Sequence, residues 1–399
     1  MKNNLIPRAE YLNRLVELRD APVIKAIVGI RRCGKSTLLR IYRDHLIASG
    51  ISEENVLLIN FTHYPYSGMS AAELNSKIRD ITGKVYLLLD EVQMFDSWDR
   101  TVLTIFENTD CDIYVTGSNS VMFSSKLTTL LSGRVVPIEM FPFSYREFLE
   151  FTEERDSDRA LDEYMLYGGF PLAAMLRHAP DAELSVLEDI YETVIIKDVA
   201  ERNKMRNTQM LGRLSNFLIR NIGSLVSVKK IKDYFTSNGI KINFETVDNY
   251  LNYLEESLAF YRAKRYNLKA KEEFSVNDKF YLSDLGLRTA ELGRRDTDIG
   301  HLIENTVYLE LRRRGFKVFV GVCGSTEIDF VAVNSKTKLY LQVCYSLEDQ
   351  TTEEREVRPL KMIKDGYPKY IVTMKQSLNV DRDGIKEIGL RELLLGKEL

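Results

Sequence analysis

The stretch GIRRCGKST, from Gly29 to Thr37, lies between the apolar run VIKAIV and a helical stretch. It matches the pattern G-x-x-x-x-G-K-[ST], in which backbone N–H groups of the loop and of the next helix cradle phosphate groups. Gly34 allows close approach of the backbone, Lys35 is the residue type that contacts β- and γ-phosphates, and Ser36 offers a hydroxyl ligand to Mg²⁺. The alternative is a chance match on a glycine turn, and the strand–loop–helix context argues against it. The predicted phosphate-binding residues are Gly29, Ile30, Arg31, Arg32, Cys33, Gly34, Lys35, Ser36 and Thr37.

Residues 22–140 alternate apolar runs with helical stretches. The runs VIKAIVGI, NVLLINF, KVYLLLD, CDIYVTG and VVPIEM are typical of strands, and segments such as KSTLLRIYRDHLIASG between them are helical in pattern. Strands that are apolar throughout and alternate with helices indicate a parallel sheet covered on both faces. The predicted fold class is therefore α/β, with the parallel sheet of a P-loop NTPase.

The run VYLLLDEVQ supplies the acids that a phosphate loop needs. Asp90 ends an apolar strand, where its carboxylate is placed to hold the Mg²⁺ shell, and Glu91 follows as the group that polarises the attacking water. The alternative is a strand that merely ends in two solvated acids. Given the loop upstream, we expect ATP and Mg²⁺ as cofactors, with Ser36 and Asp90 as the metal-binding residues.

Several motifs along the chain occur together: RRCGKST, LLLDEVQ followed by a Trp, TGSNS, LSGR, PFSYREF and YGGFP. In this order they resemble a bacterial and archaeal ATPase family that joins an AAA+-like module to a C-terminal domain of unknown function. The resemblance covers most of the chain. It implies an AAA+/ASCE-type ATPase sheet, a helical lid, a winged helix and a small C-terminal α/β domain with a PD-(D/E)XK nuclease-like fold.

The resemblance also implies roles for individual residues. Ser118, with Thr116 and Asn119 as neighbours, is the expected sensor of the γ-phosphate, although a plain polar turn fits the pattern nearly as well. Arg134 stands where AAA+ proteins carry an arginine finger that acts across a subunit boundary, which would make the protein a homo-oligomer. A surface arginine is the alternative there.

The YGGFP segment resembles the glycine-x-proline lid element of signal-transducing ATPases. Gly169, Phe170 and Pro171 would carry this element, and Gly169 and Pro171 are predicted to approach the nucleotide base. The alternative is a helix-breaking turn. The predicted domains are 1–142 (ATPase), 143–206 (lid), 207–290 (winged helix) and 291–399 (nuclease-like).

A winged helix raises the question of DNA binding. Its expected recognition helix, NFETVDNYLNYLEES, contains four acids and no Lys or Arg, which does not suit contact with phosphates or bases. The wing-like segment is basic, and a solvated face is the favoured interpretation of it, with weak DNA binding as the alternative. Its basic residues are Arg262, Lys264, Arg265, Lys269 and Lys271.

The terminal module carries carboxylates in a nuclease-like order. Glu304 falls on a predicted helix, and Glu327 and Asp329 are two apart on one strand and so share a face. In PD-(D/E)XK nucleases an acid and a lysine would follow, but here Gln342 and Cys344 stand at those positions. We therefore expect the fold to be retained and nuclease activity to be lost.

Bulk composition limits the remaining alternatives. The 55 Lys and Arg residues are balanced by 58 Asp and Glu, which does not suggest a chain coated for nucleic acid. Four scattered cysteines lack metal-ligand spacing, and a reducing cytoplasm fits them. No signal peptide or membrane span is expected.

The chain is predicted to be a cytoplasmic ATPase that acts as a switch or motor on a protein partner. One alternative is an ATP-regulated DNA-binding or DNA-processing protein. The other is an interaction protein that binds ATP without hydrolysing it.

Overall fold

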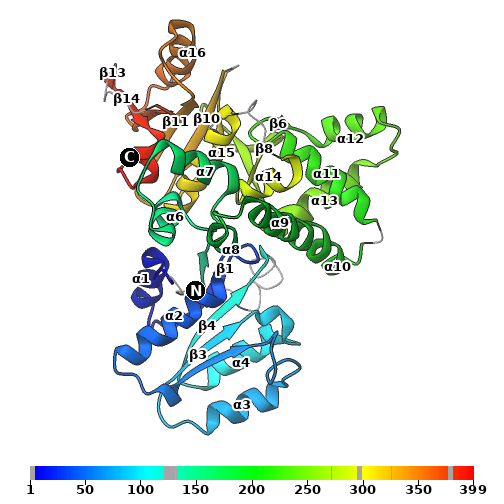
Figure 1. Cartoon of the computed structure of the whole chain (residues 1–399), viewed down its shortest axis with the longest axis vertical. Coiled ribbons are helices and arrows are strands. Elements are labelled where there is room, and N and C mark those ends of the chain that lie inside the picture. The colour runs from blue at the N-terminus through cyan, green and yellow to red at the C-terminus, as the bar shows by residue number, and fades with distance from the viewer. Residues whose placement is uncertain are drawn as a thin grey trace. The chain divides into compact units, whose positions relative to one another are not determined.

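The computed structural model describes residues 5–120, 131, 133–205, 207–270, 272–293, 299–324, 326–375 and 381–399. It divides the chain into two compact units, Met1–Phe141 and Pro142–Leu399, and each unit has its own sheet (Figure 1). None of the helices described is both long and apolar enough to cross a membrane.

The first unit is a parallel α/β sheet, as predicted. Its described residues form five strands in the order β2-β3-β4-β1-β5, and each neighbouring pair among them is parallel. Helices α1 and α2 lie on one side of this sheet and α4 on the other (Figure 1). The elements are α1 (Ala9–Glu17), β1 (Ile24–Val28), α2 (Lys35–Ala48), β2 (Val56–Asn60), α3 (Ala71–Arg79), β3 (Val85–Asp90), α4 (Trp98–Asn108), β4 (Cys111–Gly117) and β5 (Val135–Glu139).

The strand order decides which loops meet. Strand β4 lies between β1 and β3, whereas β2, which falls between the two motifs in sequence, lies at the edge of the sheet. The carboxyl ends of all five strands point the same way, so the segments that follow β1, β3 and β4 meet at one end of the sheet, which we call its carboxyl edge. Ligands bind at the carboxyl edge in open α/β sheets.

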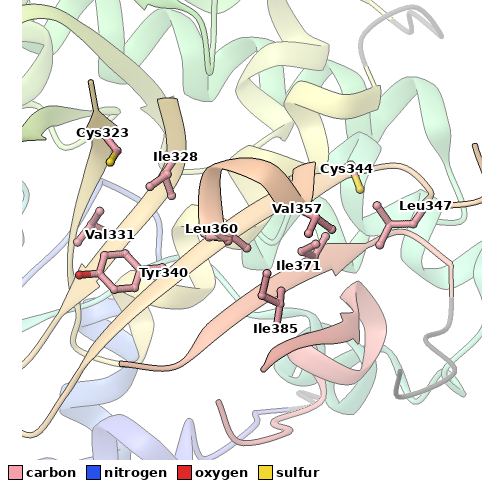
Figure 2. Packing of buried hydrophobic residues seen from close by; sticks show 10 residues of the cluster. All are labelled: Cys323, Ile328, Val331, Tyr340, Cys344, Leu347, Val357, Leu360, Ile371 and Ile385. Atoms are coloured by element: carbon pink, nitrogen blue, oxygen red, sulfur yellow. The ribbon is translucent and has the colours of Figure 1, made fainter. Parts of the chain in front are cut away.

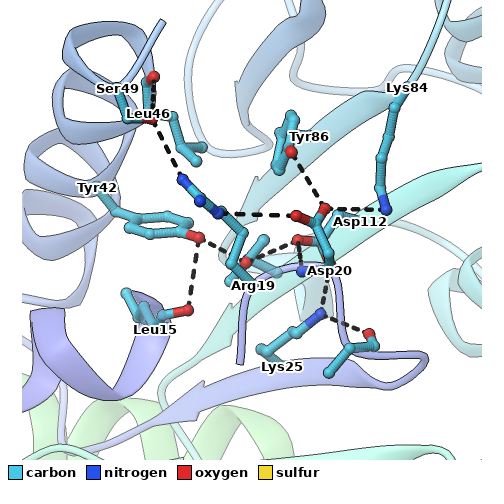
Figure 3. A network of polar contacts seen from close by, with 12 residues as sticks. Leu15, Arg19, Asp20, Lys25, Tyr42, Leu46, Ser49, Lys84, Tyr86 and Asp112 are labelled. Atoms are coloured by element: carbon cyan, nitrogen blue, oxygen red, sulfur yellow. Dashed lines mark hydrogen bonds and ion pairs between the residues drawn. The ribbon is translucent and has the colours of Figure 1, made fainter. Parts of the chain in front are cut away.

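A buried polar network holds the sheet together near the amino ends of its strands (Figure 3). Lys25 on β1 forms an ion pair with Asp112 on β4, and both side chains are almost fully buried. The Asp112 carboxylate also accepts hydrogen bonds from Tyr114 Oη at 2.8 Å and from the backbone N–H of Asp20 at 3.0 Å. Tyr114 Oη in turn lies 2.6 Å from Tyr42 Oη on α2. Because each buried charge has partners, this network fixes α2 against the sheet without leaving an uncompensated ion.

The second unit begins with a group of helices. They contain capping signals that the sequence shows: Ser144 and Glu147 form a capping box at the start of α6, and Ser157 caps α7. A π-helical turn at Glu192–Lys197 joins α9 to α10. The helices are α6 (Tyr145–Thr152), α7 (Asp158–Tyr167), α8 (Pro171–Met175), α9 (Pro180–Tyr191), α10 (Asp198–Arg202), α11 (Thr208–Arg220), α12 (Val228–Ser237), α13 (Phe244–Glu256) and α14 (Gly286–Leu292).

In the described part of this unit, a mixed sheet of nine strands organises the remaining chain, in the order β13-β14-β12-β11-β10-β9-β7-β8-β6. The strands are β6 (Leu225–Val226), β7 (Phe260–Asn267), β8 (Glu272–Leu282), β9 (Lys317–Cys323), β10 (Thr326–Val333), β11 (Lys338–Cys344), β12 (Lys369–Thr373), β13 (Asp381–Arg382) and β14 (Ile385–Gly389). Helices α15 (Ile299–Arg313), α16 (Gln350–Lys361) and α17 (Leu390–Leu394) accompany them. From α15 to α16 the order is helix, three strands, helix, as the sequence predicts.

One strand pairing joins two of the predicted domains. Strand β7, in the hairpin predicted as a wing, pairs with β8 on one side and in parallel with β9 on the other. The predicted boundary between residues 290 and 291 therefore falls inside a unit that shares one sheet. The division into four domains stays a prediction.

The C-terminal part of this sheet packs against α16 through a cluster of buried side chains (Figure 2). Cys344 belongs to this cluster, is 6% exposed, and shares the core with Ile371 and Val357. Burial, with nearby acids, raises the pKa of the Cys344 thiol to about 12. Cys344 is therefore a small apolar core residue at neutral pH.

A buried acid in the helical part gives a pH-dependent prediction. Burial, with Glu163 nearby and Arg177 opposing, raises the pKa of Glu183 from 4.5 to about 7. The folded state then holds this proton more tightly than the unfolded state, so the free energy of unfolding falls as pH rises between these two values. Glu183→Gln is expected to raise the Tm by several degrees at pH 8 and to change it little at pH 4.5. The exposed Glu188→Gln on the same helix is the control, and an equal shift at both pH values would contradict the assignment.

Candidate nucleotide site

The phosphate loop has a backbone that requires glycine at two positions. Gly34 precedes α2 with φ 107°, a conformation that L side chains rarely adopt. A Cβ at Gly29 would lie 2.0 Å from the backbone oxygen of Met140, so no side chain fits there. Because α2 begins at Lys35, the N–H groups of its first turn have no acceptor within the helix and are available to an anion.

Lys35 is buried at the centre of this loop. Its Nζ donates to the backbone oxygens of Gly29 at 2.9 Å and Ile30 at 3.2 Å, and lies 3.9 Å from Glu91 Oε1. The ammonium is thus held inside the loop by two neutral carbonyls and one distant carboxylate. Phosphate oxygens, which carry charge, are stronger acceptors than either carbonyl. Of the other loop residues, Arg31 and Arg32 are exposed, whereas Ser36 and Thr37 are half-buried at the helix start.

Arg8 anchors the loop from the N-terminal segment, which the sequence interpretation missed. Its Nη1 donates to the backbone oxygen of Cys33 at 3.0 Å, and its Nη2 donates to that of Phe141 at 2.8 Å. Arg8 is only 4% exposed, and Cys33 is fully buried. No local pattern identifies this residue, because both of its acceptors are backbone groups distant in sequence.

Asp90 ends β3 and is held by hydrogen bonds from the neighbouring strands. Its Oδ1 accepts from Thr116 Oγ1 on β4 at 2.6 Å, and its Oδ2 accepts from Asn60 Nδ2 on β2 at 2.5 Å. The side chain is 1% exposed. Since both donors are neutral, they orient the carboxylate and leave its charge for a cation.

Glu91 follows in a strained conformation, with φ 55°. Its backbone N–H donates to Thr116 Oγ1 at 2.9 Å, which fixes the turn after β3. Gln93 Nε2 donates both to Glu91 Oε2 and, at 3.2 Å, to Ser118 Oγ. Gln93 therefore links the predicted base to the predicted sensor. Gln93 is the last residue of the run VYLLLDEVQ, but nothing in that sequence pattern indicated its contact with Ser118.

Ser118 and Asn119 lie just after β4 at the same edge and are buried, at 9% and 5% exposed. Arg134 does not join them. Its backbone oxygen accepts from the N–H of Ile24 at 2.7 Å, at the amino ends of the strands, and its Nη2 pairs with Glu107 on α4 at 3.1 Å. Arg134 is therefore outside the cluster formed by its own chain, and a role across a subunit boundary stays a prediction.

Gly169 and Pro171 belong to the second unit. The N–H of Gly169 donates to Asp284 Oδ2 at 2.7 Å, and its backbone oxygen accepts from Phe143 N at 2.7 Å. A Cβ at position 169 would lie 2.2 Å from the Phe143 oxygen, and Pro171 is the first residue of α8. Local packing thus accounts for the glycine. The predicted contact of this segment with a nucleotide base stays a prediction.

These groups fit a nucleotide with Mg²⁺. An ammonium and free helix N–H groups suit phosphates, while the Ser36 hydroxyl and the Asp90 carboxylate suit a hard cation. Among the described residues, no group of three or more His, Cys, Asp or Glu is arranged to hold a metal alone. A magnesium ion at this edge would therefore need phosphate oxygens in addition to the two protein ligands.

The nuclease-like carboxylates of the second unit also come together, around a residue that the sequence interpretation missed. Lys279 Nζ on β8 lies 2.9 Å from Glu304 Oε1, 2.8 Å from Glu327 Oε1 and 3.6 Å from Asp329 Oδ1. Gln342 is buried beside Asp329, and its Oε1 accepts from the Asp329 N–H at 2.7 Å.

The basic run predicted as a wing is partly neutralised. Arg262 Nε lies 3.2 Å from Glu255 Oε2, and Lys264 Nζ lies 3.8 Å from Glu273 Oε2. Lys271 lies outside the described residues. The α13 helix retains the four acids noted above, so the described part of this region does not present a basic face built on α13.

Comparison with known proteins finds two family matches along the chain. Residues 22–149 match a family described as "AAA domain", and residues 158–298 match a domain of unknown function, DUF8612. An uncharacterised Haemophilus influenzae protein is 36% identical over 99% of this chain and 100% of its own length. The uncharacterised protein MJ1544 of Methanocaldococcus jannaschii is 30% identical over 90% of this chain and 83% of its own length.

Among solved structures, this chain is similar to the ORC1 protein of Aeropyrum pernix in complex with DNA, with 14% identity, a TM-score of 0.32, and coverage of 72% of this chain and 93% of that chain. It is also similar to AMPPCP-bound DnaA from Aquifex aeolicus, with 15% identity, a TM-score of 0.32, and coverage of 62% and 87%.

Proposed function

Because this chain belongs to the same protein family as its Haemophilus influenzae relative and carries an AAA domain, we propose that it binds ATP, hydrolyses it with Mg²⁺, and acts as a nucleotide-driven switch or motor. One observation supports this above the others: Lys35, Asp90, Glu91 and Ser118 meet at the carboxyl edge of a parallel sheet. This set supplies a phosphate-binding cation, a metal ligand, a base and a polar sensor.

Binding is assigned to the phosphate loop. The first-turn N–H groups of α2 and the Lys35 ammonium would hold the β- and γ-phosphates, and Ser36 and Asp90 would hold Mg²⁺. The metal neutralises charge on the phosphates when bound. Hydrogen bonds from Thr116 and Asn60 keep the Asp90 carboxylate oriented toward the metal position.

Hydrolysis is assigned to Glu91, whose carboxylate accepts a proton from the attacking water. Gln93 is proposed as a positioning residue, because its amide contacts both this carboxylate and Ser118. If the Ser118 hydroxyl moves to contact the γ-phosphate, its hydrogen bond with Gln93 changes. The position of the Glu91 carboxylate then changes too, because the same Gln93 amide nitrogen donates to it. The Gln93 amide oxygen is buried without a hydrogen-bond partner among the described residues, so it is available to accept a hydrogen bond from a donor that enters the site.

Replacing Gln93 with alanine is therefore expected to lower kcat for ATP hydrolysis by about tenfold and to leave the Kd for ATP unchanged. Gln93→Glu, which repels the Glu91 carboxylate, is expected to lower kcat further. Phosphate release and equilibrium ATP binding measure the two quantities separately. The control is Met94→Ala at the exposed neighbouring position. A fall in ATP affinity equal to the fall in kcat would show that Gln93 acts in binding instead.

The second unit is proposed as the part that reports the nucleotide state to a protein partner in the cytoplasm. In this proposal it contains a lid, a winged helix and a nuclease-like domain without nuclease activity. The acids of α13 and the ion pairs of Arg262 and Lys264 give no support for a DNA-binding function. Assembly into a homo-oligomer, with Arg134 acting on a neighbour, is part of the same proposal.

The test uses the purified full chain with Mg²⁺ and ATP. Equilibrium binding of a fluorescent ATP analogue and steady-state phosphate release are measured together. Binding with turnover supports the proposal. Binding without any turnover would favour a non-hydrolysing ATP-binding protein, and the absence of binding would overturn the proposal.

A further inference from the structure

The Lys279 side chain lies where three elements of the second unit bring their acids together. It extends from β8, and Glu304 comes from α15, while Glu327 and Asp329 come from β10. Lys279 is 4% exposed. Two of the three carboxylates lie within 3 Å of its Nζ, at 2.9 Å and 2.8 Å, and the third lies at 3.6 Å.

Two carboxylate oxygens of this cluster accept hydrogen bonds from groups other than Lys279. Tyr281, two residues along β8 and on the same face, donates its hydroxyl to Glu304 Oε1 at 2.6 Å. The N–H of Val343 donates to Asp329 Oδ2 at 2.9 Å. The Gln342 amide oxygen, the remaining neutral ligand that a metal could use, accepts the Asp329 N–H, and its Nε2 donates to Glu356 at 2.8 Å.

We propose that the Lys279 ammonium is the permanent counter-cation of this cluster and takes the place that a divalent metal holds in a nuclease-like arrangement. The second unit is then metal-independent. The same ammonium joins β8 to α15 and β10, and so makes the hairpin an integral part of the C-terminal domain. This inference does not depend on ATP binding by the first unit.

Electrostatics favours this arrangement. Burial opposes the charged form of Lys279, but Glu304, Asp329 and Glu327 outweigh burial and raise the pKa of Lys279 above its ordinary value. The lysine is therefore charged at neutral pH. A divalent ion placed among the same oxygens would meet this fixed positive charge at short range, and Mg²⁺ requires oxygen ligands at about 2.1 Å. An ammonium and a metal cannot both occupy the centre of three carboxylates.

The presence of Lys279 on β8 accounts for the absence of a lysine at position 344. A nuclease of this type would carry an acid at position 342 and a lysine at position 344, whereas this chain has Gln342 and a core Cys344. Relative to that arrangement one acid is absent, so the negative charge near the centre falls by one, and the positive charge comes from Lys279 on β8, between the carboxylates, in place of a lysine at position 344. Both changes disfavour a metal and favour a closed ion-pair cluster.

The first test measures Mn²⁺ binding to the nucleotide-free full chain by electron paramagnetic resonance, for the wild type and for Glu327→Gln. Glu327 is one-third exposed, so its replacement is compatible with folding. We expect the same Mn²⁺ stoichiometry in both, because in this proposal no ion binds among the carboxylates around Lys279 in either protein. One Mn²⁺ per chain that is lost in Glu327→Gln, or metal-dependent DNA cleavage lost in the same variant, would overturn the proposal.

The second test compares the Tm of Lys279→Met with that of Lys264→Met, an exposed lysine on the adjacent strand that also pairs with a glutamate. Lys279→Met leaves buried carboxylates uncompensated, and we expect its Tm to fall by about 5 °C or more, against little change in the control. Adding Glu304→Gln to Lys279→Met is expected to restore part of the loss. Equal Tm values for the two single variants, or no restoration in the double variant, would contradict a counter-cation role.

Discussion

Lys35→Ala is expected to weaken ATP binding by about 100-fold and to remove measurable turnover. The estimate follows from the loss of charge-assisted hydrogen bonds, which contribute about 1.5–3 kcal/mol each to binding. Lys35 is buried, and among the described residues its ammonium is held by two loop carbonyls and by Glu91 at 3.9 Å, so its removal breaks no large network there. Equilibrium titration with a fluorescent ATP analogue measures the affinity.

A matched control for this variant is Lys84→Ala. Lys84 belongs to the same unit but precedes β3, at the amino ends of the strands, where its Nζ pairs with Asp20 at 2.9 Å. Its removal is expected to leave ATP affinity unchanged. Unchanged ATP affinity in Lys35→Ala, with an unchanged circular dichroism spectrum, would contradict the assignment of the phosphate loop.

Glu91→Gln is expected to lower kcat by about 10²–10⁴-fold while ATP binding is retained. The amide has the shape of the carboxylate and still accepts the Gln93 hydrogen bond, but it does not accept a proton from water. The turn that presents this side chain is fixed by the backbone contact to Thr116, which the substitution leaves intact. Single-turnover phosphate release, together with equilibrium binding, separates the two effects.

Glu53→Gln, at an exposed position of the same unit, is the control for Glu91→Gln. Wild-type turnover in Glu91→Gln would show that another group serves as the base. If the variant binds ATP and does not turn it over, it also becomes a reagent. A pull-down with this trapped state would reveal which protein partner, or nucleic acid, associates with the ATP-bound form.

Much of the first unit could be predicted from short stretches of sequence. The five predicted strands and the helices between them appear with boundaries that differ by a few residues, because apolar runs and capping signals act locally. The phosphate loop could be predicted in the same way, because Gly29, Gly34 and Lys35 lie within a stretch of seven residues. The order of the strands in the sheet could not be predicted from any short stretch. That β4 separates β1 from β3, and so brings Ser118 beside Glu91, follows from packing of the whole sheet.

The residues that the sequence left unnoticed share one property: their partners are distant in the chain. Arg8 reaches backbone oxygens of Cys33 and Phe141, which carry no side-chain signal. Asn60 meets Asp90 because β2 pairs in register with β3. Gln93 turns back to Ser118 only after β3 and β4 are aligned.

The sequence by itself determined the local chemistry: a phosphate loop after a strand, two acids after another strand, and carboxylates on a later helix and strand. Tertiary structure alone decided what those carboxylates meet. Cysteine in place of lysine at position 344 predicted the loss of nuclease activity, and nothing in the sequence indicated that pairing of β7 with both β8 and β9 brings Lys279 among these carboxylates. The physical reason is that a buried charge must be compensated in space, and the compensating group need not be close in sequence.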